Sequence, residues 1–133
     1  MRAVLLDTHV WAWFMLADKL LPEAHLSMIE EADEVFVSPV SFFEISHKVR
    51  LGKWPEMAPF VDRLLPIFEA QLGRVATLTP EVSLKAGLLD WPHRDPFDRM
   101  LAASAIHYEL PLVSADVAFD QLTEQKGWIA RIW

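Results

Sequence analysis

The stretch that decides the fold is His93-Arg-Asp-Pro-Phe-Asp-Arg-Met-Leu-Ala-Ala-Ser-Ala-Ile-His107, which predicts a helix that starts at a proline. Asp95 suits the N-cap and Pro96 the first helical position, because the donor that proline lacks would have no partner there. Asp98 falls in the first turn, where the helix dipole favours an anion. Small side chains at 102–105 allow neighbouring backbone to pack closely. A carboxylate at this helix start is therefore either a cap or a ligand.

Composition limits the kinds of domain and of metal site that the chain can form. A length of 133 residues is typical of one domain, and we expect a single domain over residues 1–133. The chain has no cysteine, which excludes disulfides and thiolate metal sites. Oxygen ligands remain, with a histidine as an addition, and such ligands favour Mg²⁺ or Mn²⁺ over structural zinc.

Charge and hydropathy bear on partners and location. The sequence shows neither a signal-peptide pattern nor an apolar run of membrane-spanning length, so we expect a cytoplasmic protein with no membrane partner. The net charge of −7 argues against nucleic-acid binding, because neutralising phosphates normally requires a basic surface. That objection weakens if several carboxylates together hold divalent cations.

Short apolar runs alternate with helical patterns along the chain. The runs that predict strands cover residues 3–6, 35–37, 75–78, 110–114 and 129–133. Helices are predicted over residues 9–16, 22–31, 40–51 and 59–73 (with a kink at Pro66), from Pro80, and from Pro96. This alternation predicts an α/β fold with a short, mainly parallel sheet of about five strands flanked by helices.

Four acidic residues are expected near the carboxyl ends of these strands. Asp7 follows the first strand and Asp116 the fourth, while Glu44 and Asp98 lie in helices entered from the same side of the sheet. Ligands of parallel sheets bind beyond the carboxyl ends of the strands. Each acid alone also has a structural explanation, since Asp7 could cap a helix and Glu44 could pair with Lys48 one turn later. One shared site would explain all four positions together.

The segments that carry these acids resemble a PIN-domain nuclease, and most closely the VapC-type ribonuclease toxins of toxin–antitoxin pairs. The segments are Leu6-Asp-Thr-His-Val-Trp11, Ser38-Pro-Val-Ser-Phe-Phe-Glu-Ile45, Asp95-Pro-Phe-Asp-Arg-Met-Leu-Ala-Ala103 and Val113-Ser-Ala-Asp116. They follow the family's order with roughly its spacing, over essentially the whole chain. One departure is Ser114, where the family more often has threonine, although a hydroxyl is retained.

The resemblance implies a three-layer PIN-like fold and a divalent-metal-dependent endoribonuclease, the toxin of such a pair. It implies that the catalytic and metal-binding carboxylates are those of Asp7, Glu44, Asp98 and Asp116, with Mg²⁺ or Mn²⁺ as the cofactor. Acids are needed because metal ions polarise the phosphate that is attacked and lower the pKa of a bound water. Clustered carboxylates also repel one another until a cation satisfies them.

Further residues are expected to support this site. The supporting positions are Thr8, Asp95 and Ser114, and the sequence does not separate the role of Asp95 from that of Asp98. The candidate contacts to RNA phosphates are Lys48, Arg50, Lys53 and Arg99. The expected partners are an RNA substrate, a cognate antitoxin protein and a second copy of the chain in a homodimer.

Two alternatives to a nuclease remain open from the sequence. A haloacid-dehalogenase-like phosphotransferase also has an aspartate after its first strand, but it requires another two residues later, where this chain has His9. The other alternative is a non-catalytic acidic module that binds a partner protein and uses its carboxylates as helix caps. A metal titration separates this module from a nuclease, because a cap needs no divalent ion.

The first helix is rich in aromatic side chains. Successive helical residues turn by about 100°, so Trp11, Trp13 and Phe14 cannot all face one core. We therefore expect at least one of them to be exposed, where a partner or a second copy could cover it.

Overall fold

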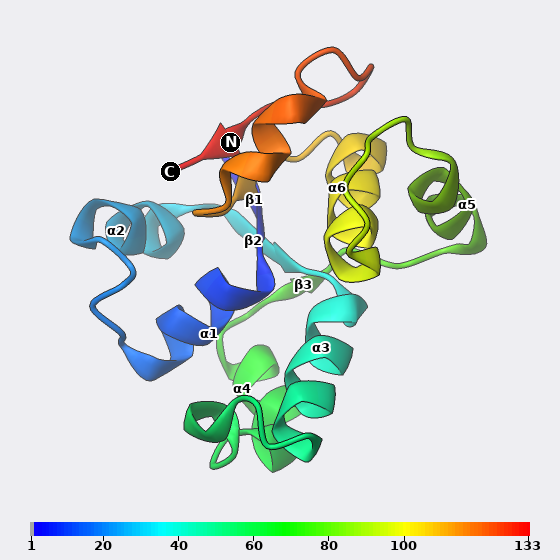
Figure 1. Cartoon of the computed structure of the whole chain (residues 1–133). Helices are drawn as coiled ribbons and strands as arrows, with labels where there is room; N and C mark the ends of the chain where they lie inside the picture. The colour runs from blue at the N-terminus through cyan, green and yellow to red at the C-terminus, as the bar shows by residue number, and fades with distance from the viewer. Residues whose placement is uncertain (1) are drawn as a thin grey trace.

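The computed structural model describes residues 2–133 and contains a five-stranded sheet in the order β3-β2-β1-β4-β5 (Figure 1). The strands are β1 (Ala3–Leu6), β2 (Glu34–Val37), β3 (Arg74–Val75), β4 (Leu112–Val113) and β5 (Arg131–Ile132). All four pairings are parallel, so the carboxyl ends of the strands share one edge of the sheet. The predicted α/β fold is confirmed, with β1 at the centre.

Helices connect the strands. The α-helices are α1 (Thr8–Leu16), α2 (Glu23–Glu31), α3 (Pro39–Arg50), α4 (Leu64–Ala70), α5 (Pro80–Leu88) and α6 (Pro96–Tyr108). The 3₁₀ helices are η1 (Pro55–Met57), η2 (Val61–Arg63) and η3 (Val117–Leu122). None of the helices among residues 2–133 has the length and apolar character required to cross a bilayer.

Apolar side chains of β1 point to both faces of the sheet and explain the three layers. Val4 and Leu6 belong to one core cluster, which also contains side chains of α1, α2, α3 and α4. Leu5 belongs to a second cluster with side chains of α6 and η3. Since all three residues are almost completely buried, the unalternating apolar run was a correct signal for a covered parallel strand.

Three helices begin with a capping side chain followed by proline, as the sequence predicted. Ser38 caps α3, Thr79 caps α5 and Asp95 caps α6, each through a side-chain oxygen that accepts a backbone N–H. These caps satisfy donors that the first turn leaves free, while proline contributes a fixed φ and no unpaired donor. The caps of α3 and α6 thereby fix where Glu44 and Asp98 enter the structure.

The helix predicted over residues 59–73 is shorter than expected. The segment forms η2, and α4 begins only at Leu64. Pro66 therefore lies in the first turn of α4, where its missing N–H costs no helical hydrogen bond, and the predicted kink is wrong. The helix η3, which begins beyond Asp116, was not predicted.

Side-chain burial also differs from expectation on two helices. The apolar pattern of residues 40–51 places Phe43 and Leu51 on one stripe with Glu44, but on α3 the buried face contains Glu44 and Ile45, whereas Phe43 and Leu51 are exposed. On α1, Trp11 is buried, and the two other aromatic residues, Trp13 and Phe14, are half-buried. None of these three side chains is thus exposed, contrary to our expectation.

Candidate metal centre

A cavity of about 370 Å³ opens at the edge of the sheet where β1 and β4 end. Its lining includes all four acids expected from the sequence, together with the expected supporting residue Asp95: Asp7, Glu44, Asp95, Asp98 and Asp116. They come from segments that are far apart in the chain. The remaining lining residues are His9, Val10, Trp13, Lys48 and Ala115.

Asp7 is both a helix cap and a buried acid of this cavity. Its Oδ1 accepts a hydrogen bond from the backbone N–H of His9 at 3.3 Å, at the start of α1. Its Oδ2 accepts one from the hydroxyl of Ser114 at 2.5 Å. Burial raises the pKa of Asp7 above its usual value, and the charge of Glu44 adds to the rise, while the Ser114 hydrogen bond opposes it. Ionised Asp7 is therefore costly here unless positive charge lies close by.

Glu44 is buried on α3 and forms the ion pair that was considered as its structural explanation. Its Oε2 lies 2.5 Å from Nζ of Lys48, one turn further along the helix. Lys48 also lines the cavity, and its ammonium group lies 5.6 Å from the ring centre of Trp54. A positive charge is thus held beside the acids.

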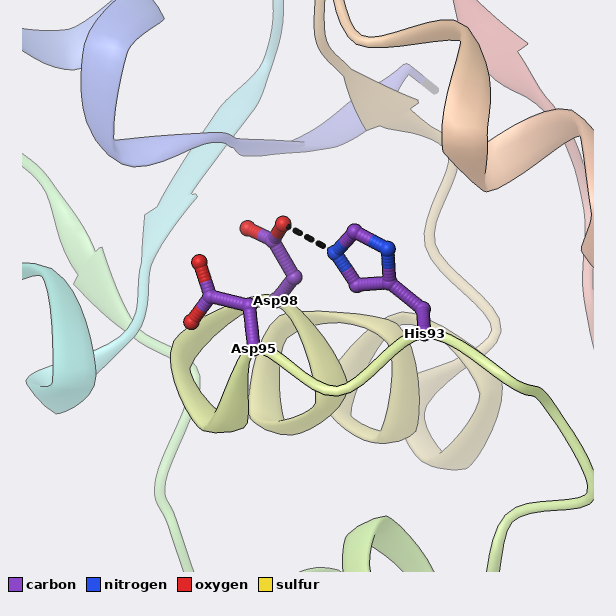
Figure 2. A group of neighbouring side chains, drawn as sticks. All are labelled: His93, Asp95 and Asp98. Carbon is purple, nitrogen blue, oxygen red and sulfur yellow. Dashed lines mark hydrogen bonds and ion pairs between the residues drawn. The ribbon is translucent and has the colours of Figure 1, made fainter.

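Asp98 and Asp95 stand at the start of α6 with different environments (Figure 2). Asp95 is exposed, and its Oδ1 accepts the backbone N–H of Phe97 at 2.9 Å, which makes it the cap. Asp98 is half-buried, and Nε2 of His93 lies 2.7 Å from its Oδ2. Burial raises the pKa of Asp98 to about 6; the His93 hydrogen bond opposes this rise, and the charges of Asp95 and Asp7 add to it.

Two hydroxyl groups join the segments that carry the acids. The Oγ of Ser114 donates to Asp7 and accepts the backbone N–H of Asp116 at 3.0 Å. Asp116 itself is exposed and caps η3 through a 2.9 Å hydrogen bond from the backbone N–H of Ala118. The second hydroxyl is that of Thr8, whose Oγ1 lies 2.8 Å from Oγ of Ser41 and so joins the starts of α1 and α3.

The basic residues fall into two groups. Lys48 lines the cavity, and Arg50 and Lys53 are exposed at the carboxyl end of α3. Arg99, in contrast, uses its guanidinium to bind the last turn of α5 and the loop before α6. Its donors meet the backbone carbonyl groups of Ala86, Gly87, Leu89, Trp91 and His93, at 2.6 to 3.4 Å. We therefore no longer place Arg99 among the phosphate contacts.

His93 is the residue of this region that sequence reasoning missed. Within residues 2–133, the one group of three metal-ligating side chains whose atoms lie within 4.8 Å of one another is His93, Asp95 and Asp98. Asp7, Glu44 and Asp116 line the same cavity but do not belong to this tight group. The available signal was a histidine five residues before Asp98, in a loop that leads directly into a helix start.

The donor set suits a hard divalent cation. Carboxylate oxygens are the ligands that Mg²⁺ and Mn²⁺ prefer, and these acids line a concave site in which burial and neighbouring negative charge disfavour the charged forms of Asp7 and Asp98. A cation between them would remove both costs. The residues therefore fit such an ion.

Comparison with known families agrees with this site and fold. The sequence model of the PIN domain matches residues 4–125. The chain therefore belongs to the PIN domain family, and the resemblance seen in its motifs is confirmed. Membership of this family rules out the alternative of a haloacid-dehalogenase-like phosphotransferase.

Within this family the chain is similar to a VapC protein. It is 33% identical over 118 residues to Ribonuclease VapC22 of Mycobacterium tuberculosis (strain ATCC 25618 / H37Rv), covering 87% of this chain and 88% of that protein. Among solved structures, it matches a chain in the crystal structure of VapBC2 from Rickettsia felis with a TM-score of 0.69. In that structure VapBC2 is bound to a DNA fragment from its own promoter. That match covers 96% of both chains at 16% sequence identity, so it supports the fold alone.

Proposed function

We propose that this chain is a divalent-metal-dependent endoribonuclease of the VapC type, formed by one PIN domain over residues 1–133. The observation that carries the proposal is the convergence of Asp7, Glu44, Asp98 and Asp116 on one cavity. Membership of the PIN family supports nuclease chemistry, and a relative with 33% identity is named a ribonuclease. RNA is accordingly the proposed substrate.

The four acids would hold Mg²⁺ or Mn²⁺, which when bound polarises the phosphodiester and lowers the pKa of an attacking water. Ser114 orients the carboxylate of Asp7 and, through the backbone N–H of Asp116, ties the two acidic segments together. The hydroxyl pair of Thr8 and Ser41 similarly fixes the start of α1 against that of α3. The chain thus presents its carboxylates from rigid elements, which limits the reorganisation required when a cation binds.

Lys48, Arg50 and Lys53 supply the positive charge that an RNA backbone would meet. Lys48 lines the cavity, whereas Arg50 and Lys53 extend the basic surface to the end of α3. On a chain of net charge −7, this small group is where phosphate binding is proposed. The RNA would then approach the acids along the carboxyl half of α3.

The proposed setting is the cytoplasm, with the chain as a toxin bound by a cognate antitoxin and paired in a homodimer. The solved VapBC2 structure motivates the antitoxin partner. The half-buried Trp13 and Phe14 line an apolar cavity with Leu21 and Leu26, which a partner could contact. Because none of Trp11, Trp13 and Phe14 is exposed, the partner proposal relies on the family more than on this surface.

The test is cleavage of a panel of structured RNAs by the purified chain, with Mg²⁺ or Mn²⁺ and with EDTA. We expect metal-dependent cleavage by the wild type and none by Asp7→Asn, which keeps the size of the side chain but removes its charge. Cleavage that persists in EDTA would contradict metal dependence. A folded wild type that binds no divalent ion and cuts no RNA would favour the acidic partner-binding module instead.

A further inference from the structure

The loop before α6 holds the carboxylate of Asp98 by a single side chain. Nε2 of His93 lies 2.7 Å from Oδ2 of Asp98, and an ionised carboxylate can only accept, so the imidazole donates. Figure 2 shows the Asp98 carboxylate between the His93 ring and the carboxylate of Asp95. His93 itself does not belong to the lining of the cavity. It therefore contacts the site through Asp98.

The imidazole ring is fixed from behind by a buried tryptophan. Trp91 stacks on His93 with ring centres 4.5 Å apart and an interplanar angle of 20°. Trp91 is 5% exposed, and its indole N–H donates to Oε1 of Gln121 at 2.8 Å. Phe119 of η3 packs against the same indole. The ring of His93 consequently has little freedom to rotate away from Asp98.

The backbone at His93 is fixed from the other side by Arg99, the neighbour of Asp98 in the chain. Arg99 donates to the carbonyl groups of Trp91 at 2.7 Å and of His93 at 2.9 Å. Residues 98 and 99 thus bind His93 at two points: the carboxylate of Asp98 contacts its imidazole, and the guanidinium of Arg99 contacts its backbone carbonyl. Because of these two contacts, the position of His93 depends on the first turn of α6.

We propose that His93 is a positioning residue that fixes the carboxylate of Asp98 for metal binding. With Oδ2 engaged by the imidazole, the other oxygen, Oδ1, is left for a cation. Hydrogen-bond partners of metal ligands typically set the affinity for the ion, and their removal costs about 10- to 100-fold. This inference rests on the proposed function, because it concerns one of the four proposed metal ligands.

The test compares three substitutions at one position. Gln can place an amide N–H near the position of Nε2, whereas the shorter Asn cannot reach it and Ala has no donor. The Mn²⁺ dissociation constant is measured by electron paramagnetic resonance without RNA, and the melting temperature is measured in EDTA. His107→Gln, at the far end of α6, is the matched control, because His107 contacts Lys85 and lies away from the cavity.

We expect His93→Ala and His93→Asn to weaken Mn²⁺ binding by about 10- to 100-fold, and His93→Gln to recover most of it. The same order is expected for kcat, with the melting temperature of His93→Gln and His93→Asn equal in EDTA. Wild-type affinity in His93→Ala overturns the inference. So does a loss in His93→Gln as large as in His93→Ala, which would make His93 a ligand instead.

The two levels of failure can be told apart. A wild type that binds no Mn²⁺ at millimolar concentration overturns the proposed function and this inference together. A wild type that binds Mn²⁺ while His93→Ala binds it equally well overturns only the inference. If His93→Ala does not fold, the comparison of Gln with Asn still decides.

Discussion

At the scale of single residues, one side chain can be a cap and a proposed ligand at once. Asp7 uses one oxygen as the cap of α1 and the other as acceptor for Ser114, within a cavity lined by further acids. Asp116 likewise caps η3 while lining that cavity. A capping position fixes a carboxylate at the start of a helix, which is also where the carboxyl edge of the sheet lies. The two explanations considered from the sequence were therefore never exclusive.

Asp98→Asn and Asp95→Asn should separate the two acids of the α6 start. Asp98→Asn should abolish RNA cleavage, because it removes the charge that the cation needs. Asp95→Asn should be milder, because Asn caps a helix about as well as Asp and the cap to Phe97 can persist. Cleavage rates at saturating Mg²⁺, with circular dichroism to verify folding, measure both effects. A wild-type rate in Asp98→Asn would show that this residue is not a ligand.

The acids should also make metal-free stability depend on pH. Asp98 has a pKa of about 6 instead of its usual 3.8, and the pKa of Asp7 is raised as well. The folded state thus binds more protons than the unfolded state between about pH 4 and pH 6, so stability falls as the pH rises through this window. In EDTA at pH 7, we expect Asp98→Asn to be more stable than the wild type by about 1–2 kcal/mol, allowing for partial solvent screening.

Urea unfolding in EDTA at pH 4, 5, 6 and 7 measures this difference. At pH 4 the wild type and Asp98→Asn should be nearly equal in stability, because Asp98 is then protonated in the folded state. Asp62→Asn is the control, since Asp62 is exposed on η2 and does not line the cavity. A difference between wild type and Asp98→Asn that is constant from pH 4 to pH 7 would contradict the raised pKa.

At the scale of elements, the loop between α5 and α6 depends on one guanidinium. Arg99 donates to three carbonyl groups of that loop and to two in the last turn of α5, and Lys cannot reproduce this planar set of donors. Arg99→Lys should therefore lower the free energy of unfolding by roughly 2–4 kcal/mol, since carbonyl groups lose charged donors. Urea unfolding measures it, with the exposed Arg50→Lys as a control that should change little. An equal effect in both variants would refute the loop-holding role of Arg99.

The sequence predicted helices and strands well where the signal consists of residues that are neighbours in the chain. Ser38, Thr79 and Asp95 each marked a helix start because cap and proline are neighbours in the chain. Signals failed where the outcome depends on distant contacts. Pro66 lies in the first turn of α4 only because the preceding residues form 3₁₀ turns. The apolar pattern of the segment did not predict the length of α4.

At the scale of the whole molecule, the topology explains why the sequence could place four acids at one cavity and could not place His93 beside Asp98. The carboxyl ends of parallel strands lie at one edge of the sheet. Asp7 and Asp116 could therefore be placed at the same edge, because each follows the end of a predicted strand. His93 depends on its stack with Trp91 and on the carbonyl contacts of Arg99, which no periodicity reveals. The carbonyl partners of Arg99 are likewise not apparent in the sequence, and Arg99 was therefore predicted to contact phosphate.

The last prediction concerns the stability of the fold with metal. An ion that binds only the folded state stabilises it by mass action, by about 2.7 kcal/mol at 100 times its dissociation constant. We therefore expect Mg²⁺ or Mn²⁺ at millimolar concentration to raise the melting temperature at pH 7, where the cavity acids repel one another most. Calorimetric melting with increasing metal measures the rise. A variant with alanine at positions 7, 44, 98 and 116 should melt at a temperature that metal does not change, and an equal rise in that variant would show that the ion binds elsewhere.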